Sequence, residues 1–171
     1  MKRHVALSVL GVLILVLADS HLDIVSQDGG KLLAISGRVV DPQGWFSEQW
    51  RQWTQDCSPV KTEPTGSDLA VSVLKLVQQH SLPDSENAKL TQLQVQGDWA
   101  IAQVAFPLLN PSVVVLNRIH GEWSIQEGAV WSGHAAPWNE ADFVRRYLLS
   151  KQPLLPQALR NCAPIGKGLR K

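Results

Sequence analysis

The sequence predicts an α+β fold in which a curved antiparallel sheet of three to four strands packs against N-terminal and C-terminal helices. Two observations carry this prediction. Between residues 93 and 131, short apolar runs alternate with turn residues such as Gln-Gly-Asp at 96–98 and His-Gly-Glu at 120–122, a pattern typical of consecutive hairpins. On both sides of this stretch, apolar residues recur with the spacing of amphipathic helices.

Residues 1–20 have the pattern of an export segment. Lys2 and Arg3 precede the uncharged apolar stretch Val5–Ala18, as in a secretory signal peptide. Fourteen helical residues span about 21 Å, which is short of the roughly 30 Å hydrocarbon core of a bilayer. Two interpretations stay open, a cleaved signal peptide or a retained N-terminal membrane anchor. Either one predicts an exported protein, periplasmic or extracellular, and the second anchors it to the inner membrane.

The rest of the chain is expected to form one α+β domain over residues 21–164 and a disordered tail over 165–171. Two short apolar runs between residues 22 and 36 predict a hairpin. Asp41-Pro42 then opens a helix, since Asp is a good N-cap and Pro fits the first helical position. We expect one face of this helix to be buried against the sheet, the face that carries Phe46, Trp50, Trp53 and Cys57.

Caps and Pro or Gly breaks define the later elements. In order, we predict a loop over 58–66, a helix from Ser67 or Asp68 to about His80, the sheet, a loop after Trp131, a helix from Asn139 or Glu140 to about Ser150, and a helical turn over 154–162.

The two cysteines, Cys57 and Cys162, are expected to form a disulfide. An even cysteine count in an exported chain indicates such a bond, and two cysteines allow only one pairing. It would close a loop of about 105 residues and stabilise the fold by on the order of 4–5 kcal/mol in the chain-entropy model. Two free thiols, or one catalytic thiol with a nearby base, are the alternatives.

Charge and motifs exclude several classes of function. The formal net charge is +1, and Lys2 and Arg3 belong to the export segment. The mature part is therefore nearly neutral, whereas nucleic-acid binding needs a clustered basic face, so we expect no nucleic-acid partner. The sequence contains no P-loop, dinucleotide-binding, zinc-protease or nucleophile-elbow motif. We therefore expect no catalytic residues and no cofactor.

The loop after the sheet holds the best candidates for a binding surface. Trp131 and Trp138 bracket this loop and His134 lies within it. Exposed aromatic side chains commonly mark binding surfaces. The spacing around His134 matches no metal site that we can name.

The weak metal candidate is His21. Cleavage after Ala18 would place this histidine third in the mature chain, after Asp19 and Ser20. The α-amine, two backbone amides and the imidazole would then form a square-planar nitrogen set, which suits Cu(II) or Ni(II).

Two turn-plus-Trp motifs carry a family resemblance. Gly-Asp-Trp-Ala at 97–100 starts one strand and Gly-Glu-Trp at 121–123 starts another, after predicted helices. This arrangement resembles cystatin-like and nuclear-transport-factor-like domains, especially small exported bacterial members, over roughly Ser67–Trp131. The resemblance implies a curved sheet cupped around a helix and a binding or accessory role. Catalytic members use a polar pocket with Asp and His, whereas these strands are mainly apolar.

We therefore expect a non-catalytic exported domain that binds a partner protein or a small apolar ligand. One alternative is a small exported enzyme with its site in the sheet cup. Another is a membrane-anchored assembly factor that uses the loop between Trp131 and Trp138. Membrane association would then run through residues 1–20.

Overall fold

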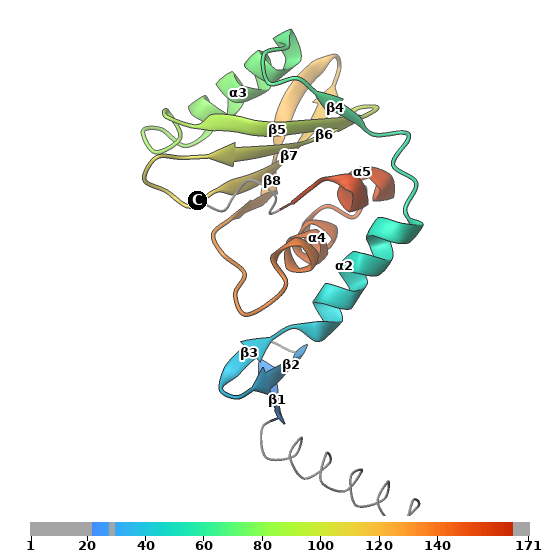
Figure 1. Cartoon of the computed structure of the whole chain (residues 1–171). Coiled ribbons are helices and arrows are strands. Elements are labelled where there is room, and N and C mark those ends of the chain that lie inside the picture. The colour runs from blue at the N-terminus through green and yellow to red at the C-terminus, as the bar shows by residue number, and fades with distance from the viewer. Residues whose placement is uncertain (1–21, 28–29, 166–171) are drawn as a thin grey trace, which may run out of the picture.

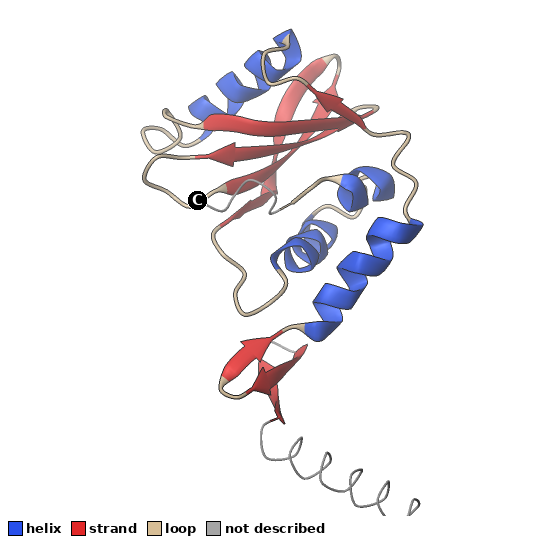
Figure 2. Cartoon of the chain, viewed as in Figure 1, coloured by secondary structure: helices blue, strands red, loops and turns tan. Residues whose placement is uncertain are grey.

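The computed structural model describes residues 22–27 and 30–165. Within them the protein is α+β, with two antiparallel sheets of three and five strands and with helices on both faces of the larger sheet (Figure 1; Figure 2). The predicted α+β class is thereby confirmed. The export segment 1–20, the metal candidate His21 and residues 166–171 of the predicted tail lie outside the described residues.

The small sheet forms from the first strands that the structure describes, β1 to β3. β1 (Leu22–Gln27) pairs with β2 (Gly30–Ile35), which confirms the predicted hairpin, and β2 pairs with β3 (Arg38–Val40), a strand that was not predicted from the sequence. Ser36 and Gly37 join β2 to β3 with positive φ angles of 49° and 81°. Such angles at both central residues match the twist of a tight hairpin.

The predicted helix after Asp41 is α2 (Pro42–Thr54). It is followed by β4 (Lys61–Glu63), which lies inside the segment predicted as a loop, and by α3 (Asp68–His80). The Ser67 side chain caps α3 by accepting a hydrogen bond from the backbone N–H of Ala70, which satisfies one of the free donors at the helix start.

The large sheet pairs its strands in sequence order, from β4 through β5 (Lys89–Gln96), β6 (Trp99–Ala105) and β7 (Ser112–Ile119) to β8 (Glu122–Ser132). The turn between β7 and β8 uses His120 and Gly121 with φ angles of 53° and 88°. The hairpins predicted from turn residues are therefore present.

Both faces of the large sheet are buried, so its central strands are apolar at successive positions rather than alternately. One face packs on α3 and contributes Ala100, Ala102, Val104, Val114 and Leu116. The other packs on α4 (Glu140–Lys151) and α5 (Gln157–Cys162) and contributes Ile101, Val113 and Val115. Ile165, which the sequence placed in a disordered tail, is 3% exposed and belongs to this second core.

The expectation that α2 buries its aromatic face against the sheet is wrong. α2 packs against α4 and β2, and α4 and α5 lie between α2 and the large sheet (Figure 1). Its buried residues are Gly44 and Glu48 rather than the aromatic ones. The reason is a polar contact with α4, described next.

Candidate functional site

Helix α2 points its polar side inward and its aromatic side outward. Glu48 is 8% exposed, whereas Trp53 is 81% exposed. At 3.6 residues per turn, the buried and the aromatic positions fall on opposite sides of the helix. We call the outward side the aromatic face; it consists of Trp45, Phe46, Trp50 and Trp53, all of which are more than half exposed.

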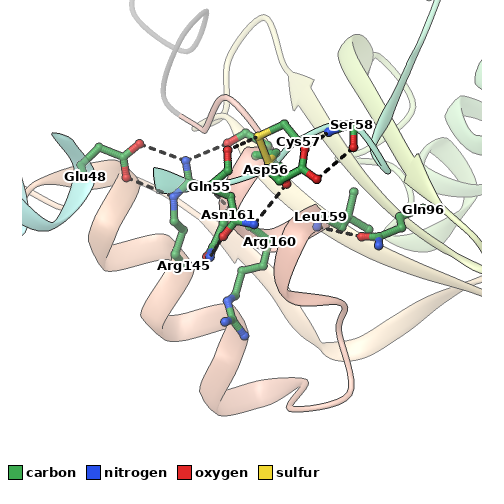
Figure 3. Close-up of a disulfide and its surroundings, with 12 residues drawn as sticks. Glu48, Gln55, Asp56, Cys57, Ser58, Gln96, Arg145, Leu159, Arg160 and Asn161 are labelled. Carbon is green, nitrogen blue, oxygen red and sulfur yellow. Dashed lines mark hydrogen bonds and ion pairs between the residues drawn. A yellow bond between two sulfur atoms is a disulfide. The ribbon is translucent and has the colours of Figure 1, made fainter. Parts of the chain in front are cut away.

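The inward side of α2 is held by a buried ion-pair network. The carboxylate of Glu48 accepts two hydrogen bonds from the guanidinium of Arg145 on α4, each at 3.1 Å (Figure 3). The guanidinium of Arg51 lies between two carboxylates, with its Nη1 2.6 Å from Oε2 of Glu48 and its Nη2 3.1 Å from Oδ1 of Asp142. Glu48, Asp142 and Arg145 are all buried. Buried charges need such partners, so the network dictates which side of α2 faces inward.

Two further N–H groups of Arg145 point toward α5. They donate hydrogen bonds to the backbone carbonyl of Arg160 on α5 and to that of Ala163 directly after it. Burial alone would raise the pKa of Glu48, but the hydrogen bonds and charge of Arg145, with help from Gln52 and Arg51, hold that pKa below its usual value. Glu48 is therefore ionised in the folded protein at neutral pH.

Both ends of α2 are also fixed. At the start, the Asp41 carboxylate accepts hydrogen bonds from the backbone N–H groups of Gly44 (2.8 Å) and Asn139 (3.0 Å). Beyond the end, Cys57 forms a disulfide with Cys162, which confirms the predicted bond (Figure 3). The helix that carries the aromatic face is therefore held by contacts at both of its ends.

The small sheet adds apolar side chains next to this face. Direct partners in an antiparallel pair share a side of the sheet, and Leu22 pairs with Ile35 while Leu33 pairs with both Ile24 and Val40. These residues therefore form one apolar side, on which Ile24 is 73% exposed. We call this the outer side of the small sheet.

A groove joins the two apolar surfaces. It has a volume of about 420 Å³ and lies between the start of α2 and the loop before α4. Its walls include Val39 and Val40 of β3, Trp45 of α2, and Pro137 and Trp138 of the loop. The groove therefore lies between Trp45 of the aromatic face and Val40 of the outer side of the small sheet.

The structure separates the residues predicted as a binding surface. Trp131 is 7% exposed and belongs to the core beneath α4, so its assignment to a surface is wrong: its position on β8 points it into the sheet–helix layer. His134 is exposed in the loop. Trp138 is half-buried, contacts Gly30 closely and lines the groove.

The aromatic face was missed because the same residues were assigned to the core. Phe46, Trp50 and Trp53 form a regular helical stripe, and such a stripe is normally buried. The sequence pattern that could have indicated the true orientation of the helix is on its other side, where the charged residues Glu48 and Arg51 lie together. Nothing in the sequence shows that their partners come from α4.

A second cavity of about 260 Å³ lies between the end of α3 and the large sheet. Its walls are mainly apolar and include Val104, Phe106 and Leu109, while His80, Asp84 and Asn110 also line it. Among the described residues, no hydrogen bond joins His80 to Asp84, so the cavity shows no assembled acid–base pair. The absence of catalysis stays a prediction.

Within residues 22–27 and 30–165, no group of three or more His, Cys, Asp or Glu side chains is placed to hold a metal ion. No helix in the same ranges has the length and apolar character needed to cross a membrane.

Comparison of the chain with protein-family models, with curated proteins and with solved structures finds no match.

Proposed function

We propose that this protein is a non-catalytic, exported binding module whose recognition surface is the aromatic face of α2. The observation that carries the proposal is the orientation of this helix. Its charged residues are buried in ion pairs while Trp45, Phe46, Trp50 and Trp53 are exposed. The Cys57–Cys162 disulfide supports a location outside the cytoplasm, because such bonds persist in oxidising compartments.

Exposed aromatic side chains at this density favour a surface that is covered in the working state. Contiguous exposed apolar patches are uncommon on isolated soluble proteins and mark contact sites. Trp residues also dominate the binding energy of many interfaces. The fixed ends of α2 add to this argument, because a rigid surface loses little conformational entropy on binding.

Oxidative footprinting tests whether the face is covered. Hydroxyl-radical labelling would be compared between the purified protein and the protein in its native envelope. We expect Trp50 and Trp53 to be labelled several-fold less in the envelope. Leu108 and Leu154 are internal controls, because they are 96% and 78% exposed and lie outside α2. Their labelling should be the same in both samples.

Equal labelling of Trp50 and Trp53 in the two samples would contradict the proposal. Protection of Leu108 and Leu154 to the same degree would indicate general shielding by the envelope and would also count against a specific surface.

A second candidate function is binding of a small apolar ligand, favoured by the 260 Å³ cavity beneath α3. It agrees with the resemblance to cystatin-like and nuclear-transport-factor-like domains, in which a curved sheet cups a pocket. The test is the affinity of a fluorescent apolar probe for the variant Leu109→Trp, whose larger side chain reduces the volume of the cavity. We expect this variant to bind the probe more weakly than the wild type. Leu108→Trp is the matched control, since Leu108 does not line this cavity. Probe binding that survives in both variants would exclude the cavity as its site.

A further inference from the structure

We propose that the aromatic face of α2 and the outer side of the small sheet lie on the surface of a lipid bilayer. This inference rests on the proposed function, because it names the partner of the same surface. It differs from anchoring by residues 1–20, since the contact is made by folded elements that the structure describes.

The residue types on this surface fit the interface between lipid and water. Trp concentrates at that interface because its large apolar ring carries a polar N–H. Three of the seven Trp residues of the chain, Trp45, Trp50 and Trp53, lie on the aromatic face. The outer side of the small sheet adds aliphatic side chains such as Ile24 and Ile35. Apolar residues of this kind enter the boundary between headgroups and acyl chains.

The charges on the same surface complement anionic lipid headgroups. Strand register places Lys31 on the outer side opposite Ser26, and Arg38 opposite Ile35, and both cations are exposed. Asp23 lies on the other side of β1, and Glu48 points into the protein. Asp41 lines the groove between the two parts of the surface, but it is 8% exposed and its carboxylate accepts hydrogen bonds from the backbone N–H groups of Gly44 and Asn139. Lys and Arg near a membrane are attracted to anionic lipids.

The same charges disfavour a second copy of the chain as the occupant. In a symmetric dimer the same patch meets itself. Lys31 and Arg38 would then face a surface whose described carboxylate, Asp41, is buried and already hydrogen-bonded, and like charges brought together oppose association.

The position of the apolar N-terminal stretch supports the bilayer. Val5–Ala18 is uncharged and is separated from β1 only by residues 19–21. Three extended residues span roughly 10 Å. If Val5–Ala18 is retained in a bilayer as an anchor, it would therefore hold the small sheet close to the bilayer surface.

Fluorescence quenching by brominated lipid tests the contact in the full chain. The protein would be reconstituted into vesicles of mixed zwitterionic and anionic phospholipid, with bromine on the acyl chains. We expect the double variant Trp50→Phe/Trp53→Phe to lose about half or more of the quenchable emission, because these rings would lie at the interface. The matched control is Trp123→Phe, a half-buried ring on β8 that stacks with Arg118. It should leave the quenchable emission unchanged.

The outcomes separate this inference from the proposed function. Quenching that is the same in the double variant and in the wild type, or absent altogether, would overturn bilayer contact. In that case, a dimer detected by sedimentation and lost in Trp53→Glu would identify a second copy as the occupant, and the proposed binding function would survive. If footprinting in the native envelope also left Trp50 and Trp53 unprotected, both proposals would fail.

A further measurement checks the role of charge. Lys31→Glu/Arg38→Glu should reduce quenching in vesicles that contain anionic lipid and have little effect in purely zwitterionic vesicles. An equal change in both lipids would show that the two cations do not contact headgroups.

Discussion

Glu48 and Arg145 form a buried two-point ion pair that joins α2 to α4, with both hydrogen bonds at 3.1 Å. Because Arg145 also binds the carbonyls of Arg160 and Ala163, one guanidinium connects three helical segments. This pair, rather than apolar packing, determines which side of α2 faces outward.

The first prediction concerns the loss of one partner. Arg145→Met should lower the free energy of unfolding by about 3–5 kcal/mol, because it leaves the buried Glu48 carboxylate without its counter-charge. The control is Arg118→Met, which removes an exposed pair with Asp98 and should cost about 1 kcal/mol or less. Urea unfolding of the oxidised protein measures both. Similar losses of unfolding free energy in the two variants would show that the buried pair stabilises the protein no more than the exposed pair does.

The second prediction concerns pH. The pKa of Glu48 is held below its ordinary value of 4.5 in the folded protein. A carboxyl group with a lowered folded pKa stabilises the protein above its unfolded pKa, and this contribution is lost as pH falls through the folded pKa. The stability advantage of the wild type over Glu48→Gln should therefore be constant near neutrality and shrink below pH 4.5.

Unfolding curves collected stepwise toward acid measure this difference. The pKa of Asp56 is also lowered, by hydrogen bonds from the backbone N–H and hydroxyl of Ser58. Both proteins retain Asp56, so its titration cancels in the comparison. An advantage that grew on acidification would contradict the assignment to Glu48.

The third prediction reverses an ordinary rule about glycine. Replacing a helical Gly by Ala usually stabilises a protein. At Gly44, however, an added Cβ would lie 2.2 Å from an oxygen of Asp41 and 2.9 Å from the Cβ of Asn139. Gly44→Ala should therefore displace the Asp41 cap and destabilise the protein. The control is Gly66→Ala, because an added Cβ there would have no atom within 4 Å apart from its chain neighbours. This substitution should be neutral or slightly stabilising. Thermal unfolding of both variants distinguishes these signs.

The fourth prediction separates function from stability on α2. Trp53→Gln should change the free energy of unfolding by no more than about 0.5 kcal/mol, because the side chain is already exposed. Leu148→Ala on α4 is the contrast, since Leu148 is fully buried and its loss should cost about 2–5 kcal/mol. A large loss of stability in Trp53→Gln would place that ring in the folding core and would remove the argument for a free aromatic face.

Local patterns predicted the elements well. The caps Asp41, Ser67 and Asn139 each mark the helix start that the structure shows, because a cap is decided by the few residues beside it. The hairpins of the large sheet also follow from local turn chemistry. The Cys57–Cys162 bond was predictable because only one pairing existed.

The orientation of α2 depends on a contact between residues far apart in the sequence, and local sequence patterns do not predict such a contact. Glu48 and Arg145 are separated by 97 positions, so no periodicity links them. Apolar patterning therefore assigned Trp50 and Trp53 to the core. For Trp131 the error was the reverse: a buried ring was assigned to the surface. The sequence places this Trp beside a loop, whereas β8 extends to Ser132 and the ring of Trp131 points into the core.

The disulfide between Cys57 and Cys162 has a mechanical consequence. It closes a covalent ring that contains the large sheet, α3, α4 and α5, while the small sheet and α2 precede the ring. Tension applied at the N-terminal end and resisted beyond Cys162 would pass directly from one cysteine to the other, and the large sheet would lie off the load path. Pulling on this chain would therefore peel α2 and the small sheet away first, leaving the ring folded.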